Sequence, residues 1–455
     1  MTKNTRTLLF VFLLLLFAIV SPAIVFYARG WRFDFRTNHF TQTGALYFKV
    51  FPRNVTAYIN NNLIKKTDFL FGTILIDNLL PNQYQAKIEK DGYFSWEKKL
   101  EVKEEQVTDA KNIVLFPQNP LFGDVVKGID EFYFSPDGSK IIIKKTVNKG
   151  WYLALYDLQR NIQSFLSEKQ GEIISLQWSP DSRLIFLAAA SNERISNYIL
   201  DTQAISNNLI GLDYLGKNIE SVNFNPQNTQ EIFYTYNGSL YKSNFTAKST
   251  DGSLLDNLII YGFSANNLYF LNNSGFVYKT DFGIGFQDKI NQVPFPVKNE
   301  TEYKLYGFQN AVFLQEGNAL YEYRPDSNSF EKLFEPIKSI KISPDSQKIV
   351  YTSDKEIGVL FLVENQNQPQ KKAGDRILIA RFSENVGDVF WFNNHYLIFN
   401  VGGQVKISEI DDRDNINKID LKDFPDNIKI FYNNADQKLY VLNSGNLYVS
   451  DNLMK

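Results

Sequence analysis

The sequence predicts an all-β protein that follows one N-terminal membrane-spanning helix, and three observations lead to this fold class. An uncharged apolar run covers residues 8–28, the chain beyond it alternates apolar and polar residues between turn signals, and one turn motif recurs between residues 134 and 353. Aromatic residues make up 15% of the chain, with 38 Phe and 25 Tyr, and this composition favours strands over helices. A hydrophobic fraction of 44% and a charged fraction of 22% indicate that most of the chain folds.

The first predicted element is a hydrophobic helix over Leu8–Ala28. At ~1.5 Å per residue its 21 residues reach ~31 Å, close to the ~30 Å hydrocarbon core of a bilayer. The alternative is a cleaved secretory signal that ends at Ser21-Pro22-Ala23, but the apolar run continues beyond Ala23. We therefore expect a retained signal anchor, with residues 1–36 as the N-terminal tail and transmembrane anchor.

The charges that flank this helix leave its orientation open. Arg29, Arg32 and Arg36 follow it, whereas only Lys3 and Arg6 precede it, and this bias alone would keep the rest of the chain in the cytoplasm. An N-terminal run of this kind more often starts translocation with its own short tail inside. We expect a single-pass protein of the cell membrane with the bulk of the chain extracytoplasmic.

Residues 37–117 predict a small all-β domain. The segments GALYFKVFP (44–52) and VTAYINNNLIKKT (55–67) alternate as strands do, and two or three more strands follow in residues 72–106. Turn residues separate these segments at Pro52, at 60–62, at 81–82 and at 91–92.

One part of this domain resembles a known family. Residues 78–102, NLLPNQYQAKIEKDGYFSWEKKLEV, are similar to the second half of a PEGA domain, whose characteristic places are occupied by Leu80, Tyr84, Lys90, Gly92, Tyr93 and Trp96. The first half departs from the pattern, since the tetrapeptide PRNV (52–55) retains only the proline. The resemblance implies a small β-sandwich that acts as a structural or interaction module in membrane-linked and surface proteins, and it implies no reaction.

After a linker at 116–126, one sequence motif recurs four times. The copies are FSPDGSKIIIKK (134–145), WSPDSRLIFLAA (178–189) and ISPDSQKIVYTS (342–353), with FNPQNTQEIFYT (224–235) as a looser copy. Each proline suits the second position of a type I turn, and Gly138 allows the left-handed residue that often closes such a hairpin. Ser182 and Ser346 stand at the same place in the other copies.

The repeats divide the rest of the chain into units of four strands. A second motif, such as NGSLYKSN (237–244) or SGNLYVSD (444–451), supplies the third strand of a unit. Spacing of roughly 36 to 48 residues is the period of a propeller blade. Eight units start near Val126, Glu172, Lys217, Leu258, Thr301, Ile337, Asn385 and Asn427.

These units predict a closed β-propeller of four-stranded antiparallel sheets over residues 118–455. Eight blades fit best, and seven is the alternative. The last unit shows only three strands, so we expect residues 113–125 to supply its fourth and to close the ring. The SPDG-type units resemble TolB-like and WD40-like propellers, and the TolB-like description is preferred because no unit has a Trp-Asp signature.

Few residues point to chemistry. The chain has no Cys and two histidines, His39 and His395, and a turn position in NNHY (393–396) explains His395 better than a catalytic base does. The cluster DDRDN (411–415) lacks the glycine and the ligand spacing of a calcium loop, and we expect a solvated loop there. Exposed Tyr and Phe could stack on sugars, although core packing explains most of them. A net charge of −2 without a basic block argues against a nucleic-acid partner.

We therefore expect a non-catalytic, membrane-tethered scaffold whose propeller face recognises a protein or a cell-envelope glycan. No catalytic, metal or cofactor-binding residue is predicted, no cofactor is implied, and the oligomeric state is open. The alternatives are an enzyme that uses carboxylates in the propeller channel on envelope polysaccharides, and a purely structural component of a surface layer.

Overall fold

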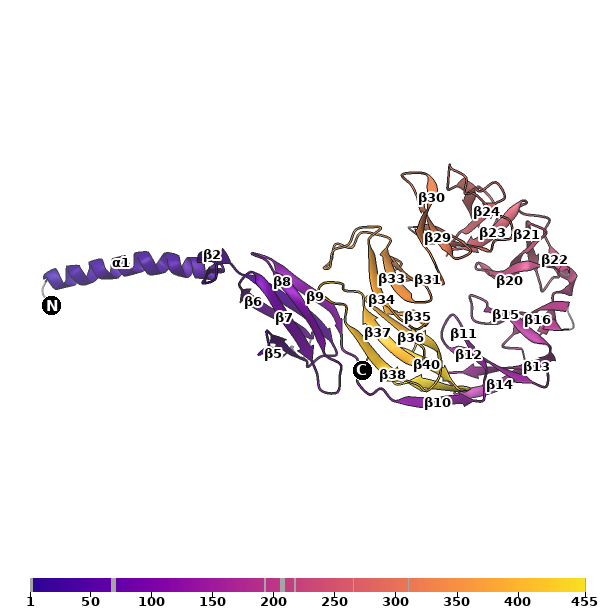
Figure 1. Ribbon diagram of the computed structural model, residues 1–455, viewed down its shortest axis with the longest axis horizontal. Coiled ribbons are helices and arrows are strands. Elements are labelled where there is room, and N and C mark those ends of the chain that lie inside the picture. Colours follow the sequence, from indigo (N-terminus) through magenta and orange to yellow (C-terminus); the bar gives the residue numbers. More distant parts are fainter. Residues whose placement is uncertain are drawn as a thin grey trace.

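The computed structural model describes residues 3–66, 71–191, 194–204, 209–216, 218–264, 266–309 and 311–454, with the backbone alone at 64–66. Figure 1 shows a long helix, a small pair of sheets and a ring of sheets that follow one another from left to right. Helix α1 (Lys3–Ala28) buries none of its residues, and it is long and apolar enough to serve as a membrane anchor or a signal sequence. The predicted apolar helix is thus present, and it begins at Lys3 rather than at Leu8.

A short hairpin follows the helix. Strands β1 (Trp31–Asp34) and β2 (His39–Gln42) pair antiparallel, with Phe33 opposite Phe40. The predicted division between residues 36 and 37 falls in the turn of this hairpin, and the hairpin itself was not predicted.

Two sheets then form a sandwich. The first has the order β6-β3-β9, in which β3 and β9 run parallel, and the second has the order β5-β4-β7-β8. The turn from β4 to β5 places Asn60 and Asn61 at φ of 49° and 66°, a left-handed geometry that asparagine tolerates. Apolar side chains from both sheets, among them Phe48, Ile88 and Trp96, share one core. The strands are β3 (Gly44–Phe51), β4 (Thr56–Ile59), β5 (Asn62–Lys66), β6 (Thr73–Leu79), β7 (Asn82–Glu89), β8 (Trp96–Val102) and β9 (Val107–Val114).

The remaining described residues form eight four-stranded antiparallel sheets, which are the blades of a propeller. Blade 1 has β11 (Glu131–Phe134), β12 (Lys140–Val147), β13 (Gly150–Asp157) and β14 (Ile162–Gln170). Blade 2 has β15 (Glu172–Trp178), β16 (Leu184–Ser191), β17 (Arg194–Asp201) and β18 (Leu209–Gly211), followed by the short 3-10 helix η1 (Asp213–Leu215). Blade 3 has β19 (Glu220–Asn225), β20 (Asn228–Tyr236), β21 (Ser239–Asn244) and β22 (Ser249–Thr250). Blade 4 has β23 (Leu258–Phe263), β24 (Leu268–Asn272), β25 (Val277–Thr280) and β26 (Asp288–Lys289).

The second half of the ring repeats this order. Blade 5 has β27 (Tyr303–Gly307), β28 (Val312–Glu316), β29 (Ala319–Arg324) and β30 (Ser329–Phe334). Blade 6 has β31 (Ser339–Ile342), β32 (Lys348–Thr352), β33 (Glu356–Phe361) and β34 (Arg376–Arg381). Blade 7 has β35 (Val386–Asn393), β36 (Tyr396–Val401), β37 (Gln404–Glu409) and β38 (Lys418–Asp423). Each first strand begins within a few residues of its predicted unit start, except that Lys217 lies outside the described residues.

The ring closes between its two ends. Blade 8 takes β39 (Lys429–Asn433), β40 (Lys438–Asn443) and β41 (Asn446–Ser450) from the end of the chain, and β10 (Phe122–Lys127) pairs antiparallel with β41 as its fourth strand. Figure 1 shows β10 beside the yellow strands of blade 8. The predicted closure is confirmed, but residues 113 and 114 belong to β9, so the closing strand starts later than expected.

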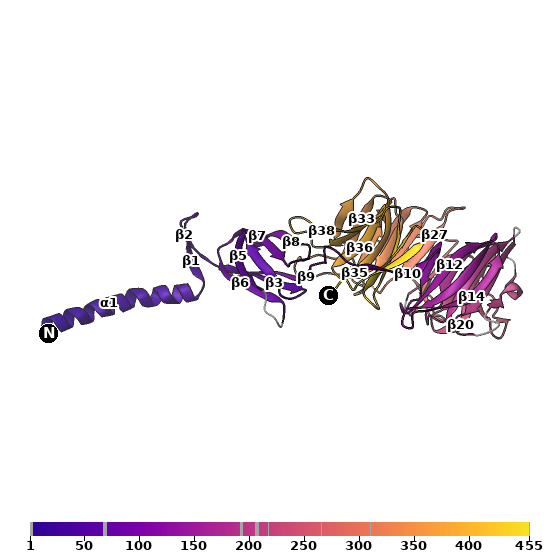
Figure 2. The ribbon, with the colours of Figure 1, turned by 90° about the horizontal axis from the view of Figure 1, so that it is seen from below.

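Buried side chains join each blade to the next. Apolar clusters span every pair of neighbouring blades. The cluster between blade 8 and blade 1 contains Tyr440 and Leu447 of blade 8 together with Phe134 of blade 1. A single blade cannot cover both of its faces, so this circular packing explains why the same strand pattern recurs in the sequence. Figure 2 shows the ring from the side, with the blades tilted around it.

The repeated turn motif has one structure in its three close copies. The serine is buried, its hydroxyl bonds the aspartate two residues later, and its Oγ accepts a hydrogen bond from the backbone N–H five residues later. These residues are Ser135, Ser179 and Ser343, with Asp137, Asp181 and Asp345. Gly138, Ser182 and Ser346 have φ of 69°, 59° and 56°, which confirms the predicted left-handed residue.

Candidate functional site

The sandwich is docked on one rim of the propeller. Strands β8 and β9 lie against two long connections, residues 362–375 of blade 6 and residues 410–417 of blade 7. Both connections join the third and fourth strands of a blade, so they share a rim with the turns between first and second strands, including the repeated Ser-Pro-Asp turns. Figure 1 shows β8 and β9 beside the orange and yellow blades.

A buried ion pair fixes this joint. Lys98 of β8 is 0% exposed, and its Nζ lies 2.6 Å from Glu409 Oε1 at the end of β37. The ammonium also donates to the backbone carbonyls of Asp411 and Asn415, at 2.7 and 2.9 Å. Trp96 Nε1 donates to the other oxygen of Glu409 at 2.8 Å. A buried charge pair is stable only when its remaining hydrogen-bonding capacity is also satisfied, and that condition is met here.

Further hydrogen bonds extend the joint along β9. Arg413 Nη1 donates to the carbonyl of Asp109 at 2.8 Å, and the Asp109 amide donates to Gln368 Oε1 at 3.0 Å. The amide of Val114 donates to Tyr396 Oη at 3.0 Å. These contacts connect residues about 260 to 310 positions apart in the sequence and hold the sandwich in one place on the rim.

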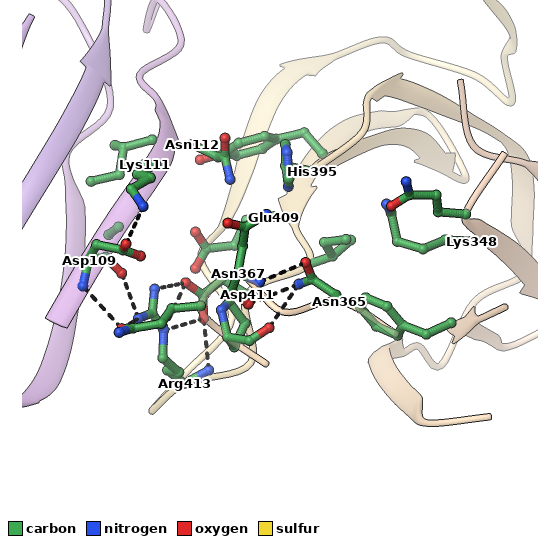
Figure 3. A pocket seen from close by; sticks show the side chains of 18 of the residues that line it. Asp109, Lys111, Asn112, Lys348, Asn365, Asn367, His395, Glu409, Asp411 and Arg413 are labelled. Atoms are coloured by element: carbon green, nitrogen blue, oxygen red, sulfur yellow. Dashed lines mark hydrogen bonds and ion pairs between the residues drawn. The ribbon is translucent and has the colours of Figure 1, made fainter. Parts of the chain in front are cut away.

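A cavity of about 270 Å³ lies within this joint. One wall is β9, and the others are the turn between β31 and β32, the turn between β35 and β36, and the two docked connections. Figure 3 shows the labelled side chains converging from the sandwich on the left and from the blades on the right. Apolar surface comes from Phe361, Trp96, Tyr396, Ile113 and Ile410.

The charged groups that line the cavity neutralise one another. Lys348 Nζ lies 2.7 Å from Asp345, Arg413 Nη2 lies 2.6 Å from Asp411, and Lys111 pairs with Asp109 at 2.5 Å. Burial opposes the ionisation of Asp345, but hydrogen bonds from Lys348 and Ser343 outweigh it and lower its pKa. Burial likewise opposes ionisation of Asp411, while Arg413 outweighs it and lowers that pKa. Both carboxylates are therefore ionised and engaged at neutral pH.

Neutral polar side chains are left available. Within the described residues, the His395 imidazole and the side-chain amides of Asn112, Gln347 and Asn367 line the cavity without a hydrogen bond from the protein. Burial, reinforced by the charge of Lys348, lowers the pKa of His395 to about 4, so its ring is neutral at pH 7 and offers one donor and one acceptor. This set suits a neutral ligand with hydroxyl or amide groups.

The lowered pKa of His395 predicts a pH dependence of stability. His395 takes up its proton near pH 6.5 in the unfolded chain and near pH 4 in the folded chain. Its contribution to the free energy of unfolding is therefore fully present above about pH 6.5 and is lost as the pH falls toward 4. In the His395→Gln variant, the midpoint of urea denaturation is expected to change less with pH between 6.5 and 4 than in the native protein. Below about pH 4, protonation of the carboxylates whose pKa values are lowered in the fold still destabilises both proteins. An unchanged slope in the variant would contradict the assignment.

The residues noted in the sequence lie in different places in the structure. His395 does lie in a turn, between β35 and β36, and it also lines the cavity. His39 is an exposed residue at the start of β2 and does not line the cavity. The loop at 411–415 lies between strands as predicted. Asp414 and Asn415 are exposed, as expected of a solvated loop, whereas residues 411–413 are half-buried because the loop packs against the sandwich. Its carboxylates diverge: Asp411 pairs with Arg413, Asp412 with Lys371, and Asp414 accepts from the Lys99 amide.

Two groups of the site, Lys98 and Asn112, were not predicted from the sequence. Lys98 occupies an inward position of β8, between Trp96 and Leu100, so its place on an apolar face was a readable signal of a buried charge. Asn112 gives no such signal, because its role arises only when β9 meets the blades.

Comparison with known proteins agrees with the fold and assigns no family. No known protein family matches the chain, and no curated protein matches it either. The Dos1 propeller is similar, with a TM-score of 0.50 and 12% identity over 72% of this chain and 94% of that one. Structures of a eukaryotic initiation factor (TM-score 0.47, 12% identity, 73% and 87% covered) and of dihydro-heme d1 dehydrogenase NirN with DHE (0.44, 13%, 64% and 68%) are also similar. At such identities the likeness to the Dos1 propeller shows a propeller fold alone.

Proposed function

We propose that this protein is a membrane-tethered, extracytoplasmic scaffold that binds a protein or a glycan of the cell envelope without chemical turnover. Its N-terminal helix is proposed as the anchor, and its sandwich as a PEGA-like interaction module. The observation that carries the proposal is the cavity at the joint, whose walls are fixed by buried contacts while its neutral polar groups stay free. Loops held on a rigid ring are the usual location of binding residues.

The chemistry of the cavity favours a neutral polar ligand. A charged ligand would compete with ion pairs that are already formed, whereas hydroxyl or amide groups find open partners at His395, Asn112, Gln347 and Asn367. A cavity of about 270 Å³ lies just below the usual range of about 300–1,000 Å³ for small-molecule sites. It suits one sugar residue or a short peptide segment of a larger envelope component.

The carboxylates at the joint favour binding over glycoside hydrolysis in this cavity. A glycosidase needs one carboxylic acid that stays protonated near neutral pH. Asp345 and Asp411 have lowered pKa values, and Glu409 is occupied by Lys98, Trp96 and Asn417.

Crosslinking on intact cells with a membrane-impermeant reagent tests the proposal. The full-length chain is expected to form adducts with an envelope component, and the Asn112→Ala/His395→Ala variant is expected to lose them, since each lost hydrogen bond weakens binding by about 0.5–1.5 kcal/mol. Asn273→Ala, in the β24–β25 turn of the opposite rim, is the matched control and keeps the adducts.

Three results would contradict the proposal. The adducts of the double variant could equal those of the control, only cytosolic proteins could be captured, or the purified protein could shorten envelope glycans. Lateral crosslinks between copies alone would favour the structural surface-layer alternative.

A further inference from the structure

The hairpin β1–β2 lies between the apolar helix and the sandwich, and its two faces differ in chemistry. Strand alternation and the pairing of Phe33 with Phe40 place Trp31, Phe33 and Phe40 on one face. Arg32, Asp34, His39 and Thr41 occupy the other face. Phe35 follows directly in the turn.

The polar face contacts the sandwich. Arg32 Nη2 donates to Asn78 Oδ1 at 2.8 Å, and Arg36 Nη2, from the turn, donates to the carbonyl of Pro81 at 3.1 Å. Thr41 bonds the carboxylate of Glu104, and Asp34 is only 4% exposed. These contacts determine which side of the hairpin is turned away from the sandwich.

Both faces of the hairpin adjoin the end of the helix, since Arg32 stacks on the ring of Tyr27 and donates to its carbonyl, while the aromatic face adds a ring contact. The ring of Trp31 contacts Phe26 of α1 edge-on at 6.1 Å, and Phe33 contacts Phe35 and Phe40 at 5.0 and 5.3 Å. Phe35 and Phe40 are nevertheless 84% and 68% exposed. Figure 2 shows the hairpin rising away from the line of the helix at its end, rather than continuing it. A cluster of exposed aromatic rings is unfavourable in water and indicates a contact surface.

We propose that this hairpin lies in the headgroup layer of the leaflet from which α1 emerges, with Phe33, Phe35 and Phe40 turned toward the acyl chains. The inference rests on the proposed anchoring of α1. A bilayer is the occupant that continuity favours, because the aromatic face adjoins the end of an apolar helix, where aromatic side chains concentrate at membrane interfaces. The exposed Arg29, at the end of the helix, complements anionic lipid phosphates at the same level.

The consequence is a fixed orientation of the sandwich and the propeller relative to the membrane. A helix alone leaves the attached domains free to tilt, whereas a helix and a lipid-bound hairpin together define a plane. Since the hairpin is also bonded to the sandwich, which is docked on the rim, the joint cavity is held at a set height above the membrane.

Single-cysteine spin labelling tests the inference, because the chain has no cysteine of its own. The full-length chain in vesicles that contain anionic lipid is labelled at Phe40→Cys, on the aromatic face, or at His39→Cys, its neighbour on the polar face. A label at Leu14→Cys in the middle of α1 reports insertion of the helix. Phe35→Cys, at the most exposed ring, is a second reporter that cannot disturb the sandwich contacts.

The expected result is several-fold greater access of oxygen than of a water-soluble nickel complex at residues 14, 35 and 40, with the reverse at 39. A buried label at 14 with labels at 35 and 40 that report water would overturn the hairpin inference and leave the anchoring intact. A label at 14 that reports water would overturn both.

Discussion

Replacing Glu409 with glutamine is expected to release the sandwich from the propeller. The change leaves the Lys98 ammonium buried at 0% exposure, with its nearest carboxylate, on Asp411, 3.7 Å away. Breaking a buried ion pair on one side destabilises the structure by about 3–5 kcal/mol. Undocking lets Lys98 reach water, so the loss is expected as faster proteolysis of the connection between β9 and β10 (residues 115–121) rather than as melting of the blades.

Two further variants make this result specific. The double variant Lys98→Met/Glu409→Gln removes both charges and is expected to recover much of the protection, as replacement of whole buried pairs by apolar groups often does. Lys99→Met changes the neighbouring, exposed lysine of β8 and is expected to have no effect. A Glu409→Gln variant as resistant to protease as Lys99→Met would contradict the ion pair at the joint.

The second large effect is expected at the seam where the ring closes. Leu447 of β41 is 0% exposed, pairs across the strands with Val126 of β10, and packs with Ile129 and Phe132 of the first blade. Leu447→Ala removes buried volume at the one place where the two ends of the ring meet. The expected cost is about 2–5 kcal/mol of unfolding free energy, measured by urea denaturation.

The matched control is Leu378→Ala in β34, where the side chain is 54% exposed. It is expected to change stability by less than about 0.5 kcal/mol. If Leu447→Ala cost no more than this control, β10 would not be part of the eighth blade.

The fold could be predicted from the sequence because its determinants are local. Each Ser-Pro-Asp turn contains its own hydrogen bonds, such as Ser179 to Asp181, and the adjoining strands must be apolar to fill the gaps between blades. The hairpin β1–β2 was missed because its four-residue strands are too short to show alternation. The predicted closing strand began too early, because the apolar residues 113 and 114 fit the end of β9 as well as they fit a closing strand.

The candidate site could not be predicted in the same way. Its parts come from segments about 300 residues apart, and nothing in the loop at 410–417 reveals that a sandwich covers it. His395 and Asp411 were both noted in the sequence, but as a turn residue and as part of a solvated loop. Only the docking of β8 and β9 turns them into the walls of a cavity.

Hydrogen exchange at residues 410–417 tests this joint most directly. Exposed surface loops normally exchange quickly, as expected for the connection at 325–328 in blade 5, whose residues are all exposed. Docking predicts slow exchange at 410–417, where the amides of Ile410, Arg413 and Asn417 are hydrogen-bonded, and a return to fast exchange in Glu409→Gln. Equally fast exchange in both loops of the native protein would contradict the docked sandwich and, with it, the proposed binding cavity.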